Sequence, residues 1–314
     1  MKNYKNFGEL LEQLRISNKM TQQQAAEGVC TIRQYSRLEK GESNPRIDVL
    51  YGLSNKFRTN LYEFYNIHFC HESFEAYQCI SDFNELISTN NFHSLDKIID
   101  QMRFLQEFET GENFQTLCYA ESLQLFLIKK DYINSIDQCY KGLGITSYQE
   151  LLKINKKPKV YSKIELCLLN TIGCNYGALE DFKKANSIFL ILIDSIDYQN
   201  EFLPFAAKYN TKFTQKFYEN TIYNLSSSYC GENELEKAKF YTEKGIASCL
   251  KENNMCFLPE LYELKSFILI DLDEKTDAKE CMENALSLYK ICNSMDQYNN
   301  LKAQYDDLFE QNKV

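Results

Sequence analysis

The sequence predicts an all-α protein in two parts: five short helices over residues 1–66, then a right-handed superhelix of about five helix pairs over residues 67–314. With only 4 Pro and 11 Gly, the 314-residue chain has too few turn residues for a large β-protein. Apolar residues recur at helical spacing along nearly the whole chain. Charge also changes near residue 66: ten Lys/Arg stand against seven Asp/Glu before it, and 25 against 37 after it. Only the first part therefore suits a polyanion.

The first part divides into helices at recognisable start and stop signals. Apolar spacing predicts a first helix over 6–18, from Phe7, Leu10, Leu11 and Leu14. Thr21 and Gln24 have the spacing of a capping box, so a second helix starts there and ends near Gly28. Thr31 is the next N-cap candidate, and Gly41 ends the third helix. Two more helices follow, marked by Ile47, Leu50, Leu53 and Phe57, then by Leu61, Phe64 and Tyr65.

The second and third helices are joined by about three residues, so they must cross steeply, as in a helix-turn-helix. Segment 20–45 resembles the Cro/repressor-type helix-turn-helix family. The matching residues are Thr21-Gln22, Ala25-Ala26, the run from Ser36 to Gly41, and Asn44-Pro45. The resemblance implies that Gln22, at a helix N-terminus, touches a DNA phosphate.

The third helix has one face for the domain core and one for DNA. Tyr35 and Leu38 are three residues apart and should face the core. Polar side chains lie opposite, where Arg can read guanine and Gln can read adenine in a major groove. The candidate DNA-binding residues are Gln22, Thr31, Ile32, Arg33, Gln34, Ser36, Arg37 and Lys40. The alternative is a solvated helix face without a role. Since one such domain rarely binds DNA specifically alone, we expect a homodimer on two half-sites.

The second part has an internal period. The spacing that matches a tetratricopeptide helix pair runs through Leu169, Ile172, Gly173, Tyr176, Ala185, Phe189 and Leu192. Gly173 is the small residue where the two helices approach. Weaker matches place the residues equivalent to Ala185 at positions 95, 135, 238 and 278. These steps of 40 to 53 residues exceed the ideal of about 34, so the repeats are degenerate. We expect a long connection over 146–161 and a capping helix or pair over 289–314.

The first helix of each repeat lines the concave wall of such an array. Projecting the template places these candidate peptide-binding residues there: Asn84, Glu121, Gln124, Asn170, Thr171, Asn220, Asn224, Ser227 and Glu263. Each Asn has a donor and an acceptor, so a row of Asn can hold an extended peptide backbone. The alternative is that some of them reach the wall by chance, because the chain is rich in Asn throughout.

A helix-turn-helix joined to degenerate tetratricopeptide repeats resembles the peptide-responsive quorum-sensing regulators of the Rgg, PlcR and PrgX kind. The resemblance implies a cytoplasmic, dimeric transcription regulator that binds double-stranded DNA and a short signalling peptide. It also implies that Tyr223-Asn224-Leu225 lies in a repeat helix that holds the peptide backbone. The alternative is a helix-turn-helix regulator whose repeats dock a protein partner instead of a peptide.

Other classes of function are disfavoured. The longest apolar runs, such as the one that contains 189–193, are far shorter than a membrane span. The 12 Cys stand singly in helical stretches, as expected of reduced thiols. The nearest approach to a metal site is His68, Cys70 and His71, which lacks a fourth ligand with zinc spacing. No nucleophile grouping or phosphate-binding loop suggests an enzyme, and we expect no cofactor.

Overall fold

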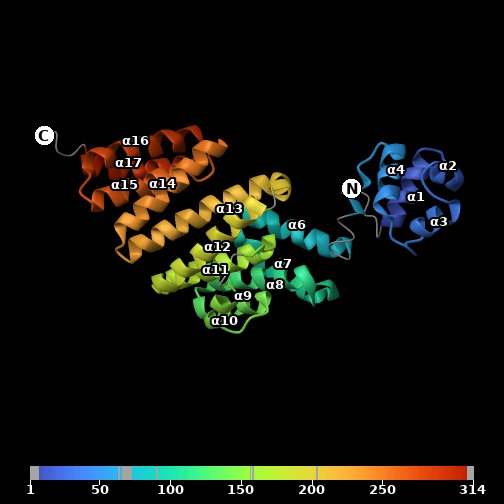
Figure 1. Ribbon diagram of the computed structural model, residues 1–314, viewed down its shortest axis with the longest axis horizontal. Helices are drawn as coiled ribbons and strands as arrows, with labels where there is room; N and C mark the ends of the chain where they lie inside the picture. Colours follow the sequence, from blue (N-terminus) through green and yellow to red (C-terminus); the bar gives the residue numbers. More distant parts are fainter. Residues whose placement is uncertain are drawn as a thin grey trace. The chain divides into compact units, whose positions relative to one another are not determined.

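The structure is a computed structural model that describes residues 7–62, 64–65, 73–89, 91–155, 157, 159–202 and 204–309. The chain divides into two compact units, Met1–Ala120 and Glu121–Val314, and each is described by itself. Helices make up both units, and none of the residues just given lies in a β-strand (Figure 1). The predicted all-α fold, a helix-turn-helix followed by helical repeats, is confirmed. The predicted His68, Cys70 and His71 group lies outside the described residues.

The first unit begins with the helix-turn-helix. Its helices are α1 (Phe7–Ser17), α2 (Gln22–Ala26), α3 (Ile32–Glu39) and α4 (Ile47–Phe57), and residues 61–62 and 64–65 are also helical. Thr21 and Gln24 form the predicted capping box: Thr21 Oγ1 accepts from Gln24 N at 3.2 Å, and Gln24 Oε1 accepts from Thr21 N at 2.9 Å. Thr31 Oγ1 caps α3 by accepting from Gln34 N at 3.2 Å. Local side-chain chemistry therefore sets the start of both helices.

These helices enclose a hydrophobic core of their own. It comprises Phe7, Leu10, Leu11, Ala25, Ala26, Tyr35, Leu38, Val49, Leu50, Leu53, Phe57 and Leu61. Gly8 lies where α1 crosses α3, and a Cβ there would be 2.3 Å from the carbonyl oxygen of Glu39. A separate core favours the predicted domain boundary at residue 66, although the division into compact units falls at Ala120. The boundary at 66 stays a prediction.

The rest of the first unit is helical as well. It contains α6 (Phe74–Thr89), η1 (Phe92–Ser94), α7 (Leu95–Phe104), η2 (Gln106–Phe108) and α8 (Gly111–Leu123), which runs on into the second unit. Leu95, Ile99 and Met102 are buried, as the weakest of the repeat matches predicts. Phe83 of α6 packs edge-on against Tyr119 of α8, with ring centroids 5.7 Å apart.

The second unit is a succession of helix pairs (Figure 1). After a π-helical segment, Gln124–Lys129, come α9 (Tyr132–Leu143), α10 (Tyr148–Ile154), α11 (Lys163–Ala178), α12 (Phe182–Phe202), α13 (Pro204–Gly231), α14 (Leu235–Glu252), α15 (Leu258–Asp271), α16 (Lys275–Ile291) and α17 (Met295–Phe309). The predicted connection over 146–161 contains the short helix α10, and the predicted cap over 289–314 contains α17. Each helix from α11 to α17 packs against the next.

The pairs α11–α12, α13–α14 and α15–α16 have the small residues that the template demands. A Cβ on Gly173 would lie 2.6 Å from Phe189 Cε1, so this position needs the close approach that only Gly allows. Ala185, Ala238 and Ala278 are all fully buried. The first helices also touch one another, α11 against α13 and α13 against α15. We call the side formed by these three helices the inner wall.

Two features are absent from the residues that the structure describes. None of their helices is both long and apolar enough to cross a membrane. Within that part of the chain, no three His, Cys, Asp or Glu side chains come together as a metal site would require. The Cys residues that the structure describes are free thiols.

Candidate functional site

Helix α3 presents two chemically different faces. Tyr35 and Leu38 point into the core and are 0% and 1% exposed, as their spacing predicts. Burial and the nearby Glu39 carboxylate raise the pKa of Tyr35, so its hydroxyl stays neutral. The opposite face carries the exposed residues Thr31, Ile32, Arg33, Arg37 and Lys40, with Gln34 and Ser36 partly exposed. The predicted contact face of α3 is thus accessible along its length.

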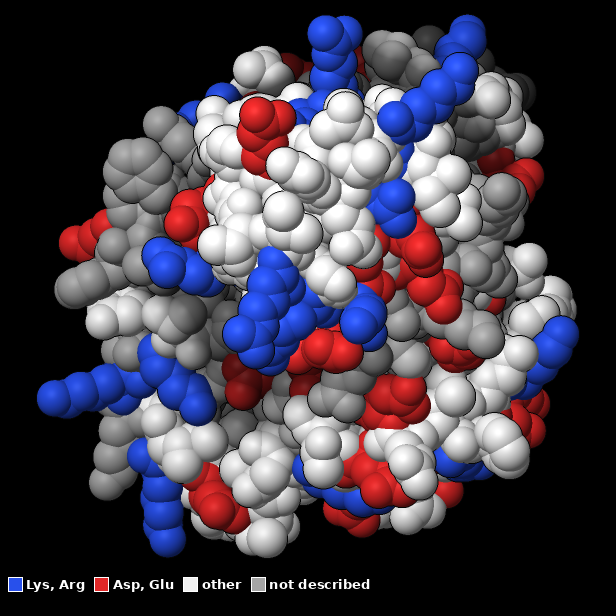
Figure 2. Space-filling model, turned by 90° about the vertical axis from the view of Figure 1, so that its right-hand side faces the viewer, with Lys and Arg blue, Asp and Glu red and all other residues white. Residues whose placement is uncertain are grey.

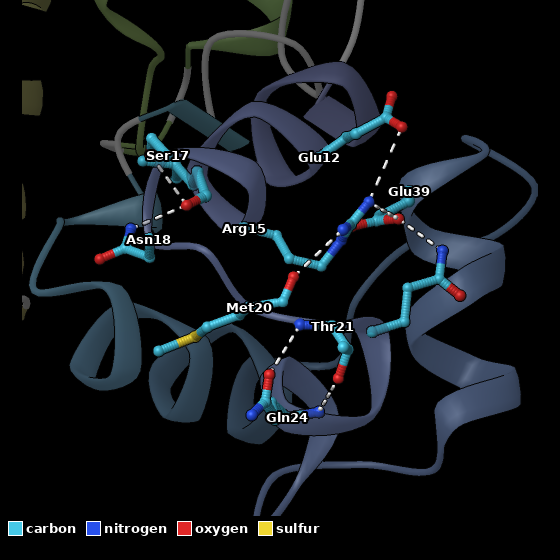
Figure 3. A network of polar contacts seen from close by, with 10 residues as sticks. Glu12, Arg15, Ser17, Asn18, Met20, Thr21, Gln24 and Glu39 are labelled. Carbon is cyan, nitrogen blue, oxygen red and sulfur yellow. Dashed lines mark hydrogen bonds and ion pairs between the residues drawn. The ribbon is translucent and has the colours of Figure 1, made fainter.

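A polar network fixes α1, α2 and α3 relative to one another (Figure 3). Glu39 is buried and accepts from Arg15 Nε at 2.6 Å and from Arg15 Nη2 at 3.3 Å. It also accepts from Gln22 Nε2 at 2.6 Å. Arg15 Nη1 donates to the carbonyl oxygen of Met20 at 3.2 Å, in the turn before α2. The hydrogen bond to Glu39 raises the pKa of Arg15. Gln22, the predicted phosphate contact, is therefore held by its amide at the start of α2.

The helix-turn-helix carries several exposed cations. Figure 2 looks from the side on which Figure 1 draws α2 and α3, and it shows a group of Lys and Arg side chains there. The exposed cations of the helix-turn-helix include Lys19, Arg33, Arg37, Lys40, Arg46 and Arg58. Arg37 is only weakly engaged, since its Nε lies 3.9 Å from Glu42 Oε2. Arg33 and Lys40 make no ion pair with a described residue. Such cations remain free to meet phosphates.

In the second unit, two predicted peptide-binding residues meet on the inner wall. Asn224 Nδ2 of α13 donates to Asn170 Oδ1 of α11 at 3.2 Å. Both amides also lie beside Cys174, with Asn224 Nδ2 at 3.5 Å and Asn170 Nδ2 at 3.8 Å from Cys174 Sγ. Burial raises the pKa of the Cys174 thiol to about 12, so it stays protonated. Sulfur is a weak acceptor, so the pair still offers N–H of Asn170 and Oδ1 of Asn224 to a ligand.

The other predicted wall residues are more scattered. Asn84 lies on α6 in the first unit and is exposed. Ser227 is exposed, Asn220 is half-buried, and Gln124 Oε1 accepts from Lys129 Nζ at 2.9 Å. Two others turn inward: Glu121 is 8% exposed, and Thr171 is 4% exposed with its hydroxyl bonded to the carbonyl oxygen of Cys167. The structure therefore brings together Asn170 and Asn224 but does not gather the whole predicted row.

Helix α15 adds carboxylates to the inner wall. The predicted Glu263 accepts from Tyr289 Oη of α16 at 2.5 Å. Glu260, one turn earlier on α15, was not among the predicted residues. Burial raises its pKa, and the neighbouring Glu263 acts in the same direction. Burial, followed by these two carboxylates, also raises the pKa of Tyr223 on α13. Tyr223, which precedes Asn224 on α13, is thus within electrostatic reach of both carboxylates.

Sequence reasoning missed several contributors. Cys174 is four residues after Asn170, and Glu260 is three residues before Glu263, so helical spacing alone could have placed each on the predicted face. Arg46 is an exposed cation at the N-terminus of α4, and its place just before the predicted fourth helix could have added it to the candidates. The Arg15–Glu39 pair joins residues 24 apart, and no local pattern signals it.

Three comparisons with known proteins bear on the helix-turn-helix and on the fold of the whole chain. Residues 11–64 match the family model "Helix-turn-helix". A search of the curated proteins returns no match. Among solved structures, Bacillus thuringiensis PlcR in complex with the peptide PapR7 and DNA is 18% identical with a TM-score of 0.70, over 95% of this chain and 99% of that one.

Two other solved structures cover nearly the whole chain. ComR from S. thermophilus, in complex with DNA and its signalling peptide ComS, is 16% identical with a TM-score of 0.55, over 96% and 98% of the two chains. The Streptococcus dysgalactiae SHP pheromone receptor Rgg2 is 13% identical with a TM-score of 0.58, over 96% and 99%. At such identities the likeness establishes a shared fold, from the helix-turn-helix through the helical array.

Proposed function

We propose that this chain is a sequence-specific DNA-binding transcription regulator controlled by a short signalling peptide bound on the inner wall of its repeats. The observation that carries the proposal is one chain that combines a helix-turn-helix match over 11–64 with the full-length fold of PlcR and ComR, both solved with peptide and DNA. Residues 1–66 form the DNA-binding domain, and residues 67–314 form the peptide-binding and dimerisation domain. The protein acts in the cytoplasm as a homodimer.

On DNA, α3 enters the major groove of each half-site. Arg33, Arg37 and Gln34 are the base-reading candidates, because Arg pairs with the two acceptors of guanine and Gln with adenine. Each such bidentate pair gives about 1–3 kcal/mol of discrimination. Gln22 and Lys40 contact the backbone, and the network around Glu39 holds Gln22 in position for it. The two DNA-binding domains of a dimer on one operator then supply the specificity that a single domain lacks.

On the inner wall, the amide pair holds the peptide backbone. An extended peptide presents an N–H and a C=O at each residue, and the pair presents one acceptor, Asn224 Oδ1, and one donor, Asn170 Nδ2. Because the two side chains come from neighbouring first helices, a peptide bound there also ties α11 to α13. The peptide changes DNA affinity only if it favours one arrangement of the array over another. The coupling free energy between peptide binding and DNA binding is typically about 1–3 kcal/mol in such systems.

The test is a titration of fluorescently labelled DNA from upstream of the gene, followed by anisotropy. Full-length protein is added with and without short peptides encoded beside that gene, at two salt concentrations. Saturable, salt-sensitive binding that one peptide shifts is the expected result. Asn224→Ala should weaken the peptide response by about tenfold and leave peptide-free DNA binding unchanged. Ser287→Ala, an exposed position on α16, is the matched control.

Two outcomes would change the proposal. Unaltered peptide affinity in Asn224→Ala would contradict the assignment of the inner wall. Tight DNA binding that no peptide shifts would favour the alternative, a regulator whose repeats dock a protein partner.

A further inference from the structure

The helix pair formed by α6 and α7 leaves a groove open along its length. The lining of its main cavity, which measures about 900 Å³, includes Glu75, Cys79 and Asp82 of α6 and Asp100 and Phe104 of α7. A second cavity of about 430 Å³ shares Asp82 and continues between the same two helices. We call this feature the α6–α7 groove. The helix pairs of an array bury one another's faces, so a groove left open on the first pair has room for a further body.

The α6–α7 groove combines apolar surface with negative charge. The side chain of Phe104 is 90% exposed, and exposed aromatic side chains are enriched where proteins bind one another. The three carboxylates Glu75, Asp82 and Asp100 face a single lysine in the lining of the main cavity. Arg103 Nη1 lies 3.4 Å from Asp100 Oδ1, but this pair is on the surface, with side chains 52% and 77% exposed. The groove therefore suits an occupant that carries both apolar side chains and cations.

The same charge disfavours a symmetric contact of the groove with its own copy. Such a contact would place carboxylates opposite carboxylates, and like charges facing each other across an interface repel. The complementary surface must therefore lie elsewhere, on a part of a partner that is basic.

One segment of this chain has that complementary character. Residues 151–164 hold five Lys and no Asp or Glu, although the sequence after residue 66 is acidic as a whole. The structure describes exposed side chains of both kinds there, and we call these residues the basic segment: Leu152, Lys153, Ile154, Lys157 and Val160. The three apolar side chains are 39%, 43% and 50% exposed. The segment thus interleaves apolar and cationic groups, as the α6–α7 groove requires.

We infer that the α6–α7 groove of one copy receives the basic segment of a second copy, so that two such contacts, related by twofold symmetry, close the homodimer. The inference rests on the proposed function, because two DNA-binding domains on one operator bring two copies together. In each contact, Phe104 meets the apolar side chains of the segment, and lysines meet Glu75 and Asp82. The two contacts reinforce each other, since the first makes the second intramolecular.

Charge reversal in the full-length protein, followed by sedimentation velocity, tests the contact. The groove variant is Glu75→Lys with Asp82→Lys, and the segment variant is Lys153→Glu with Lys157→Glu. Each variant alone places like charges in both contacts, so each should raise the dimer dissociation constant by at least about 100-fold. An equimolar mixture of the two variants should dimerise again, because both contacts of the mixed dimer then pair opposite charges.

Two controls separate this contact from general effects of charge and folding. Glu236→Lys with Glu280→Lys makes the same change of charge at exposed positions of α14 and α16, and it should dimerise as the wild type does. Phe104→Ala should weaken the dimer by about 10–30-fold, and its exposure means that the fold does not depend on it. Phe240→Ala, at an aromatic side chain that is 61% exposed on α14, should leave the dimer unchanged.

The outcomes distinguish this inference from the proposed function. A mixture of the two variants that stays monomeric, or variants that dimerise as the wild type does, would overturn the contact. A wild-type protein that is monomeric at every concentration would overturn it as well. A groove variant that loses affinity for the signalling peptide while it stays dimeric would instead assign the groove to the peptide. The DNA titration of the wild-type protein tests the regulator separately, since a peptide can shift DNA binding whichever surfaces join the two copies.

Discussion

The helix-turn-helix and the inner wall differ in how fully the hydrogen-bonding capacity of their polar side chains is satisfied. In the first, Glu39 accepts three N–H groups from Arg15 and Gln22 and binds three helices together. On the inner wall, Asn170 and Asn224 share one hydrogen bond and a sulfur atom, and Glu260 has a buried oxygen without a donor. The first arrangement is complete without a ligand, and the second is not. Under the proposed function, this difference is expected: the surface that reads DNA is held rigid before it meets DNA, whereas a wall that responds to a ligand has contacts that the ligand completes.

The largest effect should come from breaking the complete network. Glu39→Ala leaves the Arg15 guanidinium, 16% exposed, without its partner. Removing one member of a buried pair costs about 3–5 kcal/mol, so we expect the helix-turn-helix to be destabilised by that order. Urea unfolding with hydrogen exchange read in α1–α3 measures it. Glu42→Ala, which removes a surface pair at 3.9 Å, should cost below about 0.5 kcal/mol and serves as the control. Equal effects would contradict the rigid role of the network.

A second prediction uses a buried carboxylate away from the wall. Glu219 of α13 is 0% exposed and accepts from Asn254 Nδ2 at 2.6 Å. Burial raises the pKa of Glu219 from 4.5 to about 7, so between these values the folded state binds more protons than the unfolded state. Stability is therefore greatest below the lower value and falls as pH rises, by about 3 kcal/mol in total. Unfolding at about pH 5 and about pH 8 measures most of this loss. Glu219→Gln should remove most of it, and a variant as pH-dependent as wild type would refute the assignment.

Packing inside the array gives a smaller effect. Gly173→Ala places a Cβ 2.6 Å from the buried ring of Phe189, so α11 and α12 must move apart. Overpacking of this kind costs about 1–3 kcal/mol, which thermal unfolding of the full chain would detect. Gly177→Ala, on the same helix with open space around its Cβ, should be neutral or slightly stabilising. A neutral Gly173→Ala would mean that the pair is less tightly packed than the structure indicates.

The smallest effect on stability should come from the amide pair itself. Asn224→Ala removes one half-buried hydrogen bond and a weak contact to Cys174, so the free energy of unfolding should fall by less than about 1 kcal/mol. Its effect on the peptide response should be much larger. A loss of stability as great as that of Glu39→Ala would show that the pair is structural.

How well the sequence predicts each contact depends on how far apart the two residues lie in the sequence. The caps at Thr21 and Thr31 and the close approach at Gly173 are local or follow one template, and all three are confirmed. The meeting of Asn170 and Asn224 spans 54 residues, yet the repeat period predicts that both lie on one wall. The Arg15–Glu39–Gln22 network has neither a local signal nor a period, because it depends on how three helices cross. Burial of Thr171 and Glu121 escaped prediction for a similar reason: the template fixes a face but not how closely the neighbouring helix covers it.

The π-helical segment Gln124–Lys129 has an evolutionary consequence. A π turn accommodates one residue more than an α turn, so it is the form that a helix adopts after a single-residue insertion. The segment closes the helix that α8 begins, since Lys130 follows it in the left-handed conformation, and a repeat template of fixed spacing loses register before α9. Deleting one residue from the segment should restore a regular α-helix.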